Sequence, residues 1–133
     1  MPVFHADQAH ATAQRTQHAL TRLGEQLEAL RARAVDGMDF ERLERDIHAL
    51  FSAAEREVLG EELLRLDVDL PHVFIDAQRH QRVLSGWQTY TTAVGPVRVH
   101  RTLYRRTRDE RSMVPMELRA GIVEGHWTAL AAR

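Results

Sequence analysis

Hydrophobic residues recur every three or four positions through the first quarter of the chain. Apolar or small side chains fall at Ala6, Ala9, Ala13, Thr16, Leu20, Leu23, Leu27, Leu30 and Ala34. This spacing is that of a heptad seam and predicts an amphipathic helix. The second half of the seam carries four leucines, so we expect this stripe to be covered by a partner helix.

A short break separates this helix from a second one. In residues 35–39, Gly37 is expected to end the first helix and Asp39 to cap the next. A second apolar stripe begins at Phe40 and continues to Leu66, with Gly60 as a point where the helix can kink.

Two arrangements of these helices stay open, and they are not exclusive. The connection of five residues favours an antiparallel hairpin within one chain. The heptad spacing of residues 6–34 is equally typical of a coiled coil that forms a homodimer.

Beyond Leu70 the residues become β-branched and aromatic. Turn-forming pairs at Asp76-Ala77, Ser85-Gly86 and Gly95-Pro96 divide this part into four expected strands, at 72–75, 79–84, 87–93 and 97–105. The connections are too short for crossover helices, so we expect an antiparallel meander.

The last expected strand alternates in character. One face carries Val97, Val99, Arg101 and Leu103, and the other carries Arg98, His100, Thr102 and Tyr104. The first face is mostly apolar and is expected to meet the helices. Arg101 on that face then needs an acidic partner or a position at an edge.

These elements predict an α+β fold in three regions. Residues 1–70 form the helical hairpin or coiled coil, and residues 71–112 form the small antiparallel β-meander with its basic ribbon. Residues 113–133 form a loop and the start of a C-terminal helix, in which Thr128 is the expected cap.

Composition adds an unequal distribution of charge. The chain has 133 residues, no cysteine, and 18 basic residues that are all arginine. Residues 1–76 hold 8 Arg against 15 acidic residues, a balance of −7, whereas residues 77–133 hold 10 Arg against 4, a balance of +6. The use of arginine for every basic residue is explained by the arginine codons of a GC-rich genome. The separation of an acidic part from a basic part indicates an anionic partner.

The basic residues gather at and beyond the last strand. The candidate nucleic-acid-binding residues are Arg98, His100, Tyr104, Arg105, Arg106, Arg108 and Arg111. Such a ribbon can lie along a phosphate backbone, and it can equally be a solvated face that protects a sheet edge. If it binds DNA, replacing Arg98, Arg105 and Arg106 by Ala is expected to weaken binding.

The sequence offers no candidate active site. It contains no Gly-rich phosphate loop, no GxSxG and no HExxH. His72, Asp76 and His80 have the spacing of metal ligands on a helix, but they fall in a strand–turn–strand segment, where the spacing loses that meaning. We therefore expect no catalytic residue, metal or cofactor on this chain. With neither a signal peptide nor an apolar stretch long enough to span a membrane, it is expected to be cytoplasmic, with no membrane partner.

Two runs carry a resemblance to a known family. The stretch "QTYTTAVGPVRVHRTLYRR" and, shortly after it, "VPMELRAGIVEGHWTALAAR" resemble the N-terminal part of bacterial insertion-sequence transposases of the ISKra type. The first run is followed through Tyr90, Thr92, Gly95, Val97, Val99, Arg101, Thr102 and Tyr104. The second is followed from Pro115 to Arg133. "VFIDAQRHQRVL" also resembles the family, but Ala77 stands where Gly is usual, which weakens the case for a tight left-handed turn.

The resemblance implies a DNA-binding role without catalysis. Such transposases are DDE-type enzymes, in which three carboxylates hold two divalent metal ions. That domain lies downstream of the matched region, so no catalytic residue is carried over and this chain is expected to be a truncated, nucleoid-associated fragment. It would bind the DNA ends of the element or associate with itself in DNA transposition. The alternatives are a protein–protein interaction module and an inactive remnant of a mobile element.

Overall fold

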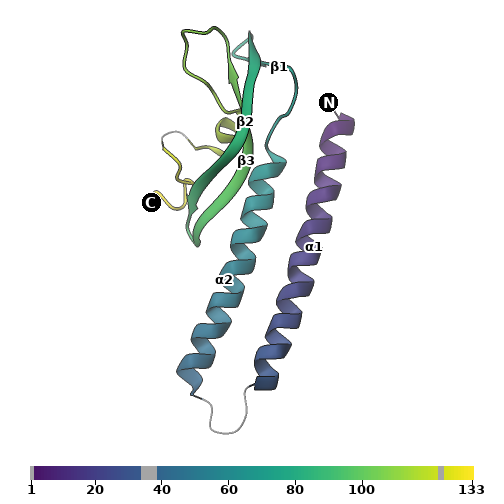
Figure 1. The fold of residues 1–133 in the computed structure, drawn as a ribbon, viewed down its shortest axis with the longest axis vertical. Helices are drawn as coiled ribbons and strands as arrows, with labels where there is room; N and C mark the ends of the chain where they lie inside the picture. Colours follow the sequence, from purple (N-terminus) through teal and green to yellow (C-terminus); the bar gives the residue numbers. More distant parts are fainter. Residues whose placement is uncertain (1, 34–38, 123–124) are drawn as a thin grey trace. The chain divides into compact units, whose positions relative to one another are not determined.

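A computed structural model describes residues 2–33, 39–122 and 125–133 of the chain (Figure 1). The order of elements is α1 (Pro2–Arg33), α2 (Phe40–Arg65), β1 (His72–Ile75), β2 (Gln78–Thr92), β3 (Gly95–Arg105) and α3 (Pro115–Ala120). Two helices, a three-stranded antiparallel sheet and a short helix confirm the expected α+β class. The chain divides into two compact units, Met1–Glu61 and Glu62–Arg133.

The first unit is a helical hairpin. Within it, α1 and α2 run antiparallel and side by side (Figure 1). Arg15 forms an ion pair with Glu61, and Arg22 forms one with Glu57, so the two helices are joined at two levels. Both pairs are partly exposed, so each contributes at most about 1 kcal/mol and serves mainly to fix the pairing of the helices.

Residues 34–38, which include the expected helix end at Gly37, lie outside the described residues. The cap of the second helix is as expected, since Asp39 Oδ1 accepts a hydrogen bond of 3.0 Å from the Glu41 N–H. Helix α2 continues through Gly60 to Arg65.

The buried stripe of α1 differs from the expected seam. Thr12 and Ala19 are buried where Ala13 and Leu20 were expected, and Leu20 is 50% exposed. From Thr12 to Leu30 the covered positions advance by 3.6 residues on average, through residues 16, 19, 23 and 27. A straight α-helix has 3.6 residues per turn, so a buried stripe with this period stays on one side of the helix. A strict seven-residue repeat would drift slowly around the helix.

The sheet has three strands, in the order β1-β2-β3, and not the four expected. The expected turn at Ser85-Gly86 is wrong, because both residues lie inside β2. Ser85 pairs with Thr102 of β3, and their hydroxyl oxygens lie 3.1 Å apart. The irregularity falls slightly earlier, as a shift in register between Arg82 and Leu84.

Both hairpins close through loops of two residues. Asp76 and Ala77 have φ angles of 52° and 63°, so the tight left-handed turn forms even though Ala77 replaces glycine. The second loop consists of residues 93 and 94, ahead of the expected Gly95-Pro96. Thr92 Oγ1 donates a hydrogen bond of 2.7 Å to the Gly95 carbonyl oxygen there, and Gly95 already begins β3.

The core of the second unit gathers residues from distant parts of the chain. It consists of Leu63, Tyr90, Val97, Val99, Val114, Met116 and Ile122. Leu63 lies in the last turn of α2, which accounts for the unit boundary falling ahead of the expected residue 70. The core also includes α3, which was not expected; Gly121, with φ 76°, ends that helix.

The last residues, where the start of a helix capped by Thr128 was expected, form a single turn. In it the Ala132 N–H donates to the Thr128 carbonyl oxygen at 3.1 Å. Just before it, Trp127 forms a parallel bridge with Thr91 of β2. The two runs that carry the family resemblance therefore pack against each other in one unit.

Candidate nucleic-acid interface

One face of the β2–β3 ribbon carries an aromatic and basic cluster, which we call the Trp87 cluster: Trp87, Arg98 and His100. Trp87 pairs with His100 in the ladder, and Thr89 pairs with Arg98, so all four side chains stand on the same face. The Arg98 guanidinium carbon lies 5.0 Å from the centroid of the indole ring. The His100 ring meets the indole edge-on, with centroids 5.3 Å apart and an angle of 76° between planes.

The cluster is open to solvent. Trp87 is 60% exposed, and the side chains of Thr89, Arg98 and His100 are exposed as well. Among the described residues, no carboxylate lies within ion-pairing distance of Arg98. Its guanidinium makes a cation–π contact with the indole ring and, within the described part of the chain, remains available to an anion.

Further along the same face the ribbon is covered. Asp67 accepts hydrogen bonds from the backbone N–H and the hydroxyl of Thr102, at 2.9 and 3.0 Å. Burial raises the pKa of the Asp67 carboxyl, although the Thr102 hydrogen bonds oppose that shift. The segment after α2 therefore covers the ribbon from Thr102 onward and sets the limit of the open face.

Tyr104, expected at the interface, is part of this covered region and is fully buried. Its hydroxyl donates to the carbonyl oxygens of Val68 and Leu70, at 2.9 and 2.7 Å, and accepts from the Leu70 N–H at 2.9 Å. Burial raises the pKa of the Tyr104 phenol. The prediction that Tyr104 lies at the interface is wrong, because a buried ring cannot stack on a ligand.

On the opposite face, Arg101 lies on β3, which is an edge strand of the sheet, and its side chain contacts the Tyr90 hydroxyl. Its Nε donates to the Tyr90 hydroxyl at 3.3 Å, and that hydroxyl donates to Glu117 Oε2 at 2.5 Å. Burial, and then the hydrogen bond to Glu117, raise the pKa of the Tyr90 phenol. This network joins β2, β3 and α3, so it is part of the core architecture.

The arginines beyond Arg101 are placed differently from one another. Arg106 forms an ion pair with Glu110 and donates to Gln78 Oε1 at 2.7 Å. The Arg106 hydrogen bond lowers the pKa of the Glu110 carboxyl, so the charges of this pair satisfy each other. Arg105 is half-buried opposite Gln81, at the other end of the ribbon from Arg98.

The last two candidates, Arg108 and Arg111, are exposed in the loop after β3. Of the seven predicted residues, the structure therefore brings Arg98 and His100 together. The other five are buried, paired with an acidic residue, or placed in another part of the unit. The residue that sequence reasoning missed is Trp87. It could have been found from the loop at residues 93 and 94, because a loop of two residues there places position 87 opposite position 100.

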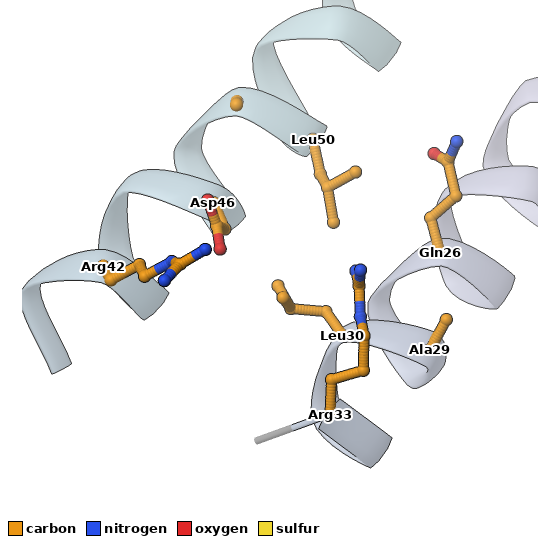
Figure 2. A pocket seen from close by; sticks show the side chains of 8 residues that line it. Gln26, Ala29, Leu30, Arg33, Arg42, Asp46 and Leu50 are labelled. Carbon is orange, nitrogen blue, oxygen red and sulfur yellow. The ribbon is translucent and has the colours of Figure 1, made fainter. Parts of the chain in front are cut away.

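The helical unit has a hollow of its own between α1 and α2 (Figure 2). Leu30 and Leu50 point into it, and Arg33, Arg42 and Asp46 stand around it. Its apolar base and mixed charges form no arrangement of catalytic groups. Nowhere in the described part of the chain do three or more His, Asp or Glu side chains gather as metal ligands would.

Comparisons with known proteins do not extend this description. No family model, curated protein or solved structure matches the chain. Of the helices described, none is both long enough and apolar enough to cross a membrane.

Proposed function

We propose that this chain binds DNA through the open face of the β2–β3 ribbon. The observation that carries the proposal is the position of Arg98 over the exposed ring of Trp87, with His100 at the ring's edge. An arginine without an acidic partner provides a phosphate ligand, and an exposed aromatic ring provides a surface for a base. Neither β2 nor β3 contributes an acidic side chain, which would repel phosphate, to this face.

The biological setting we propose is the leading region of an insertion-sequence transposase. The support is the resemblance of residues 88–106 and 114–133 to transposases of the ISKra type. In this setting the chain contributes DNA binding near the bacterial nucleoid and no catalysis of its own. Any divalent metal ion would belong to a catalytic domain outside this chain.

The test is DNA binding by the whole chain across a series of salt concentrations, followed by fluorescence anisotropy of labelled DNA. Binding is expected to weaken as salt rises, because contacts to phosphate release counterions. Arg98→Ala is expected to reduce the slope of log K against log salt by about 1. Absence of binding at low salt would refute the proposal and favour a protein–protein interaction module or an inactive remnant.

A second candidate function is self-association through α1. The observation behind it is that Ala13 and Leu20, one heptad apart, are exposed on the outside of the hairpin. A second copy of α1 in parallel or antiparallel contact would cover this stripe. Sedimentation at tens of micromolar tests it, with a dimer expected for the natural chain and a monomer for Leu20→Glu. A natural chain that sediments as a monomer would end this proposal and leave DNA binding standing.

A further inference from the structure

The Trp87 cluster also indicates which form of DNA it suits. Trp87 is 60% exposed, and yet its ring has two neighbours, Arg98 over its face and His100 at its edge. Contacts on a rigid two-stranded ladder restrict how the indole can turn. An aromatic ring held in one orientation before binding loses less entropy when a ligand stacks on it.

We infer that Trp87 is a stacking platform for an unpaired base, and that the chain prefers single-stranded DNA to duplex DNA. The inference rests on the proposed function, since it takes DNA as the ligand. An indole stacks on the flat face of a base, and in a duplex both faces of each base are covered by its neighbours. Those faces become accessible in single strands, overhangs and bulges.

The surroundings of Trp87 fit a single strand. Arg98 lies over one face of the indole, so a base stacked on the other face would place its nucleotide close to a guanidinium that can bind phosphate. The hydroxyl of Thr89, an exposed residue on the same face, can donate to a neighbouring phosphate. A β-ribbon in the major groove of a duplex would instead meet the edges of bases, where the indole has few partners.

The experiment compares a single-stranded oligothymidylate of twelve nucleotides with a twelve-base-pair duplex, using the whole chain at low salt. Anisotropy gives the two affinities. A Trp127→Phe background leaves Trp87 as the only tryptophan, so its fluorescence reports stacking directly. Trp87→Ala is the test variant and Trp87→Phe the conservative one; because Trp87 is largely exposed, neither is expected to unfold the chain.

The single strand is expected to bind more tightly than the duplex and to quench Trp87 fluorescence. Trp87→Ala should weaken single-strand binding roughly 5- to 150-fold, the loss of one stacked base, and should remove the preference. Trp87→Phe should restore part of both. Equal or tighter duplex binding without quenching would overturn the inference and leave the proposed function intact. Failure of both DNAs to bind would overturn both.

Discussion

Asp67 accepts two hydrogen bonds from Thr102, one from its backbone N–H at 2.9 Å and one from its hydroxyl at 3.0 Å. Both residues are buried, Asp67 at 7% and Thr102 at 1% exposure. This contact fastens the segment after α2 to β3. It is also the boundary on the ribbon between the covered part and the open Trp87 cluster.

The first prediction concerns the stability that this contact provides. Thr102→Val keeps the shape of the side chain but removes the hydroxyl, so a buried carboxylate oxygen loses its partner. The free energy of unfolding, measured with urea, should fall by about 1–3 kcal/mol. Thr89→Val is the matched control on the exposed part of the same face and should change it by no more than about 0.5 kcal/mol. Equal effects at the two positions would show that the Asp67 contact stabilises little.

The second prediction concerns pH. Burial raises the pKa of Asp67 above its ordinary value of 3.8. A raised pKa in the folded state means that folding favours the protonated form of Asp67. The stability gained from this protonation is fully present below pH 3.8 and is lost as the pH rises through the folded-state pKa.

Asp67→Asn removes this titration and keeps an acceptor for the Thr102 N–H. The stability of the variant relative to the natural chain should therefore rise as the pH is raised above about 4. Urea titrations of both proteins at several pH values above about 4 measure the difference. A difference that stays constant or falls with pH would contradict the assigned direction.

The third prediction concerns the first hairpin loop. Ala77 has a φ of 63°, a conformation that costs a residue with a β-carbon about 1–2 kcal/mol relative to glycine. Ala77→Gly should therefore stabilise the chain, by roughly 1 kcal/mol once the greater freedom of glycine in the unfolded chain is subtracted.

Ala93→Gly in the other hairpin loop is the control. Ala93 is not among the described residues with positive φ, so glycine offers it no relief of strain. That variant should be destabilised by about 0.4–1 kcal/mol. Thermal or urea unfolding of both variants gives the comparison, and destabilisation by Ala77→Gly would show that the left-handed turn carries no strain.

The fourth prediction separates architecture from binding at Tyr104. Tyr104→Phe removes the hydroxyl that bonds to Val68 and Leu70, so the free energy of unfolding should fall by about 1–3 kcal/mol. Because the ring is buried, DNA affinity of the folded variant should stay within about twofold of the natural chain. A large loss of affinity without loss of stability would return Tyr104 to the interface.

Several parts of the structure could be predicted from the local sequence. The α+β class, the antiparallel sheet and the cap at Asp39 follow from periodicity and from side-chain chemistry within a few residues. The burial of Val97 and Val99 was also predictable, since alternation along a strand is local.

The candidate site was harder to predict, because it depends on contacts between distant residues. The position of the second turn decides which residue lies opposite His100. The turn expected at Gly95-Pro96 lies two residues beyond the observed loop, so it hid the pairing of His100 with Trp87. Tyr104 lies on the same strand face as Arg98, but the segment after α2 covers only one of them. The alternation of side chains along a strand does not indicate which part of either face another segment will cover.

The measurement that tests the central claim most directly compares two arginines. Arg98→Ala and Arg106→Ala lower the net charge equally, but Arg98 lies on Trp87 without an acidic partner among the described residues, and Arg106 is paired with Glu110. DNA affinity measured by anisotropy at one salt concentration should fall roughly tenfold for Arg98→Ala and no more than about twofold for Arg106→Ala. Equal losses, or a larger loss for Arg106→Ala, would contradict the assignment of the Trp87 cluster as the DNA-binding face.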